Sequence, residues 1–111
     1  MTGIVTVYAT FASDEEARRI ARILVEERLA ACANILGDCH SIYRWQDKVE
    51  EAGEVAVLFK TASEGAPALV AAIRGAHSYD VPAITVLPIA HTHDAYADWV
   101  RNNSRGALRG T

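Results

Sequence analysis

The sequence lacks any cluster of basic residues, and this bears directly on its partners. Its 11 Lys and Arg residues are outnumbered by 14 Asp and Glu residues, which gives a formal net charge of −3. A protein of this charge has no electrostatic attraction for phosphate backbones. We therefore expect no nucleic-acid partner.

Long apolar runs are also absent. The first residues, MTGIVTVYATFAS, carry no basic start, and their apolar residues alternate with Thr and Tyr, unlike a secretory signal peptide. No segment of the chain reaches the length that a membrane-spanning helix requires. We expect no membrane contact, and the cytoplasm is the default location.

Cysteine is scarce, with Cys32 and Cys39 as the only two. Seven residues apart on one flat strand, they are too distant for a disulfide, and reduced thiols fit a cytoplasmic protein. The chain has no GxGxxG, P-loop or GxSxG motif and no Cys and His residues at zinc-site spacing. We therefore expect no organic cofactor and no enzymatic activity.

The residues that are present fit a single domain over residues 1–111. Half of them are apolar, which is enough to fill one core. Their periodicity predicts strands at 3–11, 32–61 as a hairpin and 83–89, helices at about 14–29, 67–75 and 92–103, and a frayed tail at 104–111. This order is the ferredoxin-like βαββαβ arrangement of an α+β protein, with a short C-terminal helix added.

Particular residues mark the expected helix ends. Ser13 and Glu16 have capping-box spacing before the first helix. Gly75 is expected to stop the second helix. Thr92 is expected to cap the last helix, and we prefer this role to a metal site between the two histidines that flank it.

The hairpin predicts self-association. A continuous strand from Cys32 to Trp45 would be about 45 Å long, whereas a domain of this size is only about 35 Å across. The tip would then overhang the domain and expose apolar side chains, which soluble monomers avoid. We expect a homo-oligomer joined through this hairpin. We expect its turn at Gln46-Asp47. The alternative is a strand that breaks at Gly37-Asp38 and folds back on its own domain, but a glycine bulge usually bends a strand without ending it.

The segment HSYDVP, residues 77–82, gathers polar side chains before an apolar strand. Two interpretations remain open. In one, His77, Tyr79 and Asp80 form a hydrogen-bonded cluster in which the carboxylate orients the imidazole. In the other, the segment is a structural turn that closes the preceding helix.

Several separate blocks resemble a known family. The segments ARILVEERLAACANI, SIYRWQDKVE, EVAVLFKT, HSYDVPAITVLPI and YADWV are similar, in order and spacing, to those of the CutA divalent-cation tolerance proteins. The resemblance covers nearly the whole chain. It implies a homotrimer assembled through the long hairpin and shaped like PII-type signalling proteins, with copper or another divalent cation, or a small anion, bound in clefts between subunits.

Carried over position by position, the resemblance also implies the binding residues. His77 takes the place of a metal ligand. The other shared positions, which would line the cleft, are Tyr43, Trp45, Glu54, Lys60, Tyr79, Asp80 and Trp99.

The chain departs from the family pattern at four of its positions. Ser78 replaces a usual Pro, and Asp80 replaces the commoner Glu, so this carboxylate is shorter. Ala9 and Ala76 stand where some members carry a Cys and a second His. Because thiolates and imidazoles are the ligands that copper prefers, a copper site is expected to be weaker here or elsewhere.

Three functions therefore remain open. The first is a trimeric module that binds a divalent cation, such as Cu(II), or a small anion. The second is a PII-like scaffold for a small molecule or a protein. The third is a small hydrolase or isomerase in which His77 acts as general base, which would need an adjacent electrophile-stabilising group that the sequence does not show.

Overall fold

The computed structural model describes residues 2–106, and it confirms the predicted α+β class and order of elements. A 3₁₀ turn, Ser63–Gly65, precedes the second helix. The strands and helices are β1 (Ile4–Phe11), α1 (Asp14–Glu26), β2 (Cys32–Trp45), β3 (Lys48–Ala62), α2 (Ala66–Ala76), β4 (Ile84–Pro88) and α3 (Asp94–Asn103). Within the described residues, no helix is both long enough and apolar enough to cross a membrane.

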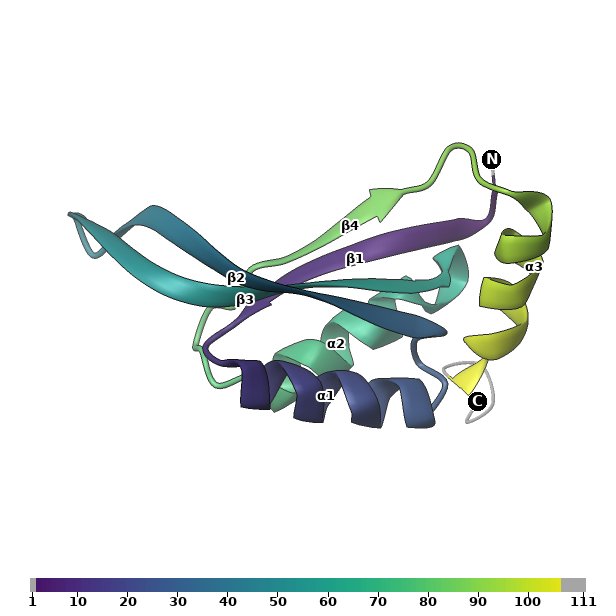
Figure 1. Cartoon of the computed structure of the whole chain (residues 1–111), viewed down its shortest axis with the longest axis horizontal. Helices are drawn as coiled ribbons and strands as arrows, with labels where there is room; N and C mark the ends of the chain where they lie inside the picture. The colour runs from purple at the N-terminus through teal and green to yellow at the C-terminus, as the bar shows by residue number, and fades with distance from the viewer. Residues whose placement is uncertain (1, 107–111) are drawn as a thin grey trace.

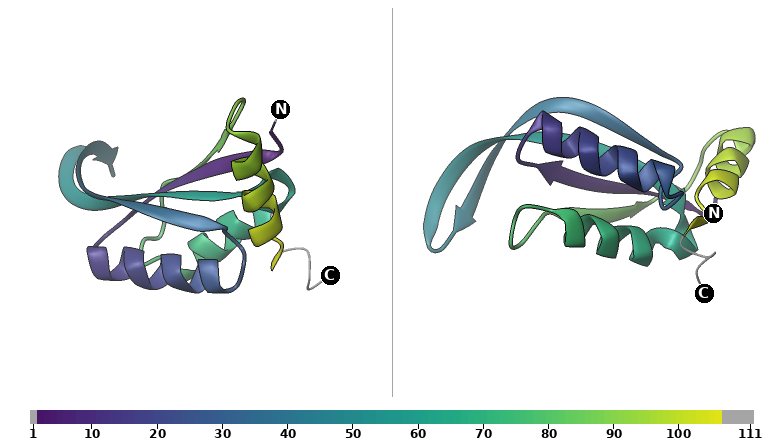
Figure 2. Two further views of the ribbon diagram at one scale, coloured as in Figure 1. Left: turned by 45° about the vertical axis from the view of Figure 1, so that its right-hand side comes forward. Right: turned by 90° about the horizontal axis from the view of Figure 1, so that it is seen from below.

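The four strands form one antiparallel sheet in the order β2-β3-β1-β4. Helices α1 and α2 lie side by side across one face of this sheet (Figures 1 and 2). Alternate residues of β1 and β3 point to this face, because side chains on a strand alternate between its two sides. Val7, Phe11, Val57 and Phe59 are fully buried there among the apolar side chains of both helices.

The opposite face of the sheet is covered only at one end. Helix α3 stands at that end (Figure 1) and buries Ala97 and Val100 against Ile4 and Ala31. Beyond α3, towards the hairpin, this face of the sheet has no helix over it among the described residues, and we call it the open face. Because α1 and α2 cover the other face, a binding site formed by the sheet must lie on the open face.

Strand β2 is continuous past Gly37, so the alternative of a strand that ends there is wrong. A bulge falls between Ile35 and Gly37, and Gly37 adopts a φ of 97° that only glycine takes easily. Beyond the bulge the pairing runs without interruption to Trp45, opposite Lys48. The extra residue bends the strand and restarts the ladder, as bulges do.

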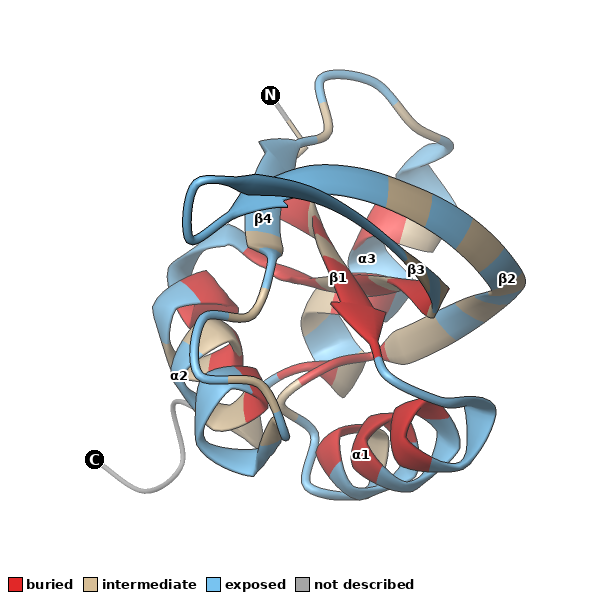
Figure 3. Ribbon diagram, turned by 90° about the vertical axis from the view of Figure 1, so that its left-hand side faces the viewer, coloured by how far each residue is buried: buried red, intermediate tan, exposed pale blue. Residues whose placement is uncertain are grey.

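The hairpin extends beyond the rest of the domain, as its predicted length requires. The molecule is 44 Å long and only 29 Å and 22 Å across, and the hairpin forms one end of its long axis (Figure 1). Its outer part is exposed (Figure 3). The predicted turn residues, Gln46 and Asp47, have φ angles of 51° and 66°, which fits a tight hairpin turn made without glycine.

The first two helices end differently from the sequence prediction. Helix α1 ends at Glu26 rather than near Leu29, since Arg28 takes a left-handed conformation with φ 61°. Gly75 does not stop α2, which continues through Ala76. The chain leaves the helix at His77 because its backbone is extended there.

The C-terminal region also differs from the sequence prediction. The N-cap of α3 is His93, which makes no side-chain capping bond, so Thr92 is not the cap. Residues 104–106 are not frayed: Ser104 is buried and donates to the Val100 carbonyl while accepting from the Ala62 N–H. The Gly106 N–H donates to the Arg28 carbonyl. The rest of the predicted tail, 107–111, lies outside the described residues.

Candidate functional site

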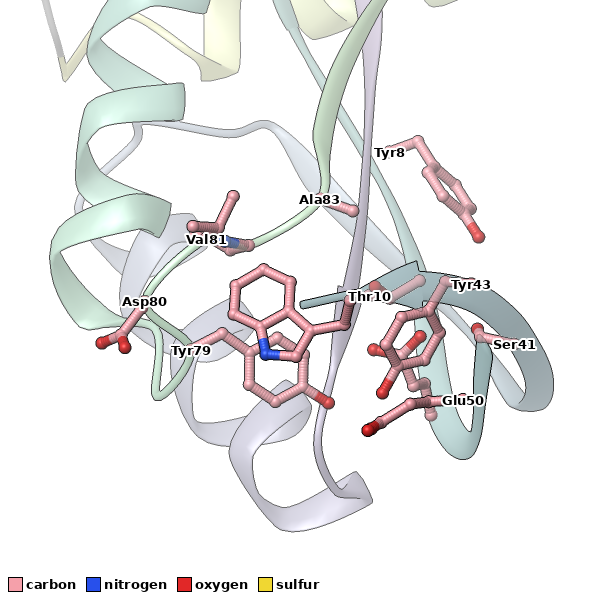
Figure 4. Close-up of a pocket in the computed structure, with 12 residues that line it drawn as sticks. Tyr8, Thr10, Ser41, Tyr43, Glu50, Tyr79, Asp80, Val81 and Ala83 are labelled. Carbon is pink, nitrogen blue, oxygen red and sulfur yellow. The ribbon is translucent and has the colours of Figure 1, made fainter. Parts of the chain in front are cut away.

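An open groove of about 720 Å³ lies where the hairpin leaves the sheet (Figure 4). The open face forms the floor of the groove, and the loop between α2 and β4 forms the wall opposite the hairpin. The lining residues are Tyr8 and Thr10 of β1, Ser41, Tyr43, Trp45, Glu50 and Glu54 of the hairpin, and residues 79–83 of the loop.

Strand register explains why these side chains meet. Residues directly opposite each other in an antiparallel ladder point to the same face. Tyr43 lies opposite Glu50. Ser41 lies opposite Ala52, which precedes Glu54 by two residues. Thr10 of β1 lies opposite Ala56 on the same face, two residues after Glu54. Positions that are far apart in the sequence therefore become one continuous row on the open face.

Glu16 holds the loop in place from the other side of the sheet. Its backbone N–H donates to the Ser13 hydroxyl at 3.1 Å, which is the expected capping interaction. Its carboxylate accepts from the Ala12 N–H at 3.1 Å and from the Ser78 N–H at 2.9 Å. Burial alone would raise the pKa of Glu16, but the hydrogen bonds from Ser78 and Ala12 and the nearby His77 hold this pKa below its ordinary value.

His77 is part of the same support. Its Nδ1 accepts from the Tyr79 N–H at 3.0 Å, so Nε2 carries the proton and donates to the Thr10 carbonyl at 2.7 Å. The ring stacks on Phe11, with centroids 4.9 Å apart. Thr10 and the loop backbone therefore orient His77, where the sequence had suggested Asp80. In this arrangement neither ring nitrogen has a lone pair to give to a metal ion.

Tyr79 is the loop residue that reaches the hairpin. One side of its ring packs on His77, with centroids 4.7 Å apart. Burial and the nearby Glu54 carboxylate raise the pKa of Tyr79 to about 12. Tyr79 and Glu54 both line the groove.

The charge of the groove is negative. Glu50, Glu54 and Asp80 are the only charged residues among the described ones that line it. Figure 4 shows the Glu50 carboxylate beside the Tyr43 ring, whereas Asp80 lies on the far side of the loop. The groove therefore offers two carboxylates to a bound molecule and favours a cation over an anion.

Lys60 and Trp99 do not belong to this groove. Lys60 is six residues from Glu54 along β3, which is about 20 Å, and its ammonium group donates to the Asn34 side chain at 3.2 Å. Trp99 lies on α3 and stacks on Tyr96, with centroids 5.9 Å apart. The structure thus brings together Tyr43, Trp45, Glu54, Tyr79 and Asp80, places His77 behind them, and leaves Lys60 and Trp99 elsewhere.

The α3 end of the sheet has a smaller polar contact. The hydroxyl of Tyr96 lies 3.5 Å from the thiol of Cys32, and burial together with this contact raises the pKa of Tyr96 to about 12. Cys32 and Cys39 are both free thiols.

The described residues of one chain do not fit a copper ion. No group of three or more His, Cys, Asp or Glu side chains among residues 2–106 is arranged to hold a metal. Both nitrogens of His77 are engaged, and Ala9, at a position where some family members carry Cys, is fully buried in the core. A complete metal site would need ligands from a second chain.

Sequence reasoning did not identify some of the residues that line the groove. Tyr8 and Thr10 sit in an ordinary alternating strand, and Glu50 belongs to a charged stretch near the hairpin tip. The only available indication was register: once Gln46 and Asp47 are taken as the turn, Glu50 falls opposite Tyr43. Glu16 was identified as a capping residue, but nothing local indicated that its carboxylate also binds the loop.

Comparisons with known proteins agree with this architecture. The family model described as CutA1 divalent ion tolerance protein matches residues 5–103. The divalent-cation tolerance protein CutA of Thermus thermophilus is 48% identical over 98 residues, covering 88% of this chain and 95% of that protein. The human protein CutA is 40% identical over 94 residues, and the match spans 85% of this chain but only 52% of the human protein.

Solved structures give the same result. The divalent cation tolerance protein structure from Thermus thermophilus superposes with a TM-score of 0.88 at 46% identity, covering 91% of this chain and 98% of that one. CutA1 from Oryza sativa superposes with a TM-score of 0.89 at 34% identity, covering 95% and 98%. The chain belongs to the CutA1 divalent ion tolerance protein family.

Proposed function

We propose that this protein acts in divalent-cation tolerance as a homotrimer that binds Cu(II) or another divalent cation in the clefts between its subunits. The observation that carries the proposal is the groove at the root of the hairpin, where Glu50 and Glu54 supply negative charge without a basic neighbour among the described lining residues. Carboxylate oxygens are common ligands of divalent cations.

The location between subunits follows from what one chain lacks. Its described residues do not place three metal-ligating side chains together, so a neighbouring subunit would have to complete the coordination. The hairpin is the element that would bring the neighbour there. Ile42 and Val49 near its tip are 66% and 64% exposed, and Trp45 is 42% exposed. Contact between chains would bury these apolar surfaces.

The assembly that we propose is a PII-like trimer of ferredoxin-like subunits. The strand order β2-β3-β1-β4 with two helices on one face supports the ferredoxin-like arrangement. A single domain over residues 1–111 and a cytoplasmic location remain part of the proposal, the latter because Cys32 and Cys39 are free thiols.

A scaffold for a small molecule or a protein is the second candidate. It is favoured by the size of the groove and by its aromatic walls, which exceed what a metal ion needs. We do not propose an enzyme. A general base needs a nitrogen lone pair near a substrate, and that of His77 is taken by the Tyr79 N–H.

The proposal is tested by calorimetric titration of the metal-stripped protein with Cu(II) and with Zn(II), with its mass in solution measured by light scattering. We expect saturable binding in a protein of three-chain mass. Glu54→Gln should weaken binding about tenfold, the effect of about 1.4 kcal/mol, while the mass stays that of a trimer.

Two further variants separate the roles of the site residues. Glu51 is next to Glu50 in β3, but its side chain points to the opposite face of the strand. The Glu51→Gln protein should therefore bind the cation like the unmodified protein. His77→Ala removes the support of the loop. If His77→Ala abolishes binding while Glu54→Gln has no effect, the imidazole is the ligand and the carboxylate site is wrong. If the trimer binds neither ion, the scaffold is the better interpretation.

A further inference from the structure

We infer that His91 and His93 form a second metal site, which captures a Cu(II) or Ni(II) ion that keeps part of its own water or chelating ligands. Both residues belong to the connection between β4 and α3. This connection lies at the end of the molecule opposite the hairpin (Figure 1). Neither residue is part of the hairpin, the groove or the open face, which are the surfaces that the proposed assembly uses. The inference therefore does not depend on the proposed function.

The structure removes the reason for assigning this segment to helix capping. The sequence favours Thr92, between the two histidines, as the cap of α3. The N-cap is instead His93, and no side chain caps the helix there. The His93 carbonyl accepts from the N–H groups of Tyr96 and Ala97 at 3.0 Å and 3.1 Å. Its imidazole takes no part in the start of the helix.

The backbone turns both imidazoles outward. His93 is extended, with φ −63° and ψ 128°, and residues 89–93 belong to no helix or strand. His91 and His93 are exposed, whereas Thr92 between them is half-buried. Residues two apart in an extended chain that share a side lie about 6.5–7 Å apart. This separation is close to the roughly 5–6 Å between positions i and i+4 of a helix, where paired histidines bind zinc.

Both imidazoles are available to a metal ion. The other two of the four histidines are engaged: His40 Nε2 lies 2.6 Å from the Glu51 carboxylate, and both nitrogens of His77 are occupied. Within residues 2–106, His91 and His93 make no side-chain hydrogen bond or ion pair. Imidazole is a ligand that Cu(II) and Ni(II) favour, whereas Mg²⁺ and Ca²⁺ favour oxygen. The pair therefore selects transition metals.

Two ligands make a partial and exchangeable site. No three metal-ligating side chains lie together among the described residues, so the captured ion must retain ligands of its own. The second imidazole strengthens binding because, once the first is bound, it acts as an intramolecular ligand. The N-terminus of α3 carries partial positive charge, and Asp94 in its first turn offsets this charge.

The test uses Cu(II) iminodiacetate as the probe. The chelator leaves positions on the copper for imidazoles, and its carboxylates cancel the charge of the ion, so Glu50 and Glu54 attract it little. We expect the metal-stripped protein to bind the chelate saturably. The visible absorption of the copper should move to shorter wavelength, because nitrogen replaces water. His91→Ala and His93→Ala should each weaken binding about 100-fold.

His40→Ala is the matched control. The His40 side chain is 65% exposed, but it pairs with Glu51 and has no second imidazole two residues away. It should bind the chelate like the unmodified protein. A loss in His40→Ala equal to that in the loop variants would show unspecific capture by surface imidazoles. A loss in only one of His91→Ala and His93→Ala would show a single ligand. Either result would overturn the inference.

The groove is distinguished by a reciprocal experiment. Glu54→Gln should leave binding of the chelate unchanged. The double variant His91→Ala/His93→Ala should lose the chelate and keep the binding of free Cu(II) or Zn(II) that Glu54→Gln weakens. An unmodified protein that does not bind the chelate would overturn the histidine site, including the case in which a neighbouring subunit covers it. Loss of the chelate in Glu54→Gln would place it in the groove and would also overturn the inference.

Discussion

Replacing Glu16 by Gln should destabilise the protein and loosen the loop that carries Tyr79. The carboxylate is buried and accepts from two backbone donors, the N–H groups of Ala12 and Ser78. A glutamine of the same shape offers only one acceptor oxygen, and its amide N–H₂ group would face the other donor. One of the two hydrogen bonds is therefore lost, and the acceptor of the other is no longer charged.

The magnitude follows from opposing terms. A hydrogen bond to a charged group contributes about 1.5–3 kcal/mol. Burial of the charge opposes it, which is why burial alone would raise the pKa of Glu16. We expect a net loss of about 1–2 kcal/mol in the free energy of unfolding. Urea denaturation at one fixed protein concentration measures it, since the proposed self-association would make stability depend on concentration.

Glu15→Gln is the matched control for this prediction. Its carboxylate is 75% exposed and pairs with Arg19 four residues along the helix, so its removal should cost less than about 0.5 kcal/mol. Equal losses for the two variants would refute the reasoning, because they would show that only the charge of the first helical turn matters.

The pH dependence gives an independent check on Glu16. Its pKa in the folded protein lies below the ordinary value of 4.5, so the folded state favours the ionised form. The stabilisation is therefore fully present above pH 4.5 and is lost as the pH falls through the folded-state pKa. The difference in stability between the unmodified protein and Glu16→Gln should shrink on acidification over that window. A constant difference would contradict the assignment.

Two further predictions concern the hairpin and the groove. Gly37→Ala should cost about 1–3 kcal/mol in a urea titration, because alanine resists a φ of 97°; Gly53→Ala, opposite His40 and without a positive φ, should cost clearly less. Ultraviolet titration should show two tyrosines with a pKa of about 12, Tyr79 and Tyr96, of which only one should remain in Tyr79→Phe. Because the pKa of Tyr79 is raised from 10.0, its stabilisation is present below pH 10 and is lost as the pH rises towards 12.

Sequence reasoning recovered much of the fold. The Ser13 cap of the first helix, the turn at Gln46 and Asp47, and the glycine bulge at Gly37 are local features, and the structure confirms each of them. Helix ends were predicted less well, since propensity alone does not determine where a packed helix stops. The α2 helix continues past Gly75, where glycine is tolerated in an ordinary helical conformation.

The site was recovered only in part. The resemblance to CutA proteins selected five residues that line the groove, because the positions of a shared motif can be transferred to this sequence without a structure. It also selected Lys60 and Trp99, which the folded chain places beyond the groove. The resemblance gives one list of shared positions, whereas the structure separates those that meet within one chain from those that lie apart.

By itself the sequence determined the alternation of strands and helices, the length of the hairpin and the net negative charge, because these depend on neighbours along the chain. Only the tertiary structure decided that the Glu16 carboxylate binds the Ser78 N–H and that both nitrogens of His77 are engaged. Strand register likewise decided which aromatic and acidic side chains share the groove. These facts depend on contacts between residues that are far apart along the chain, and no local pattern encodes the distance between such residues.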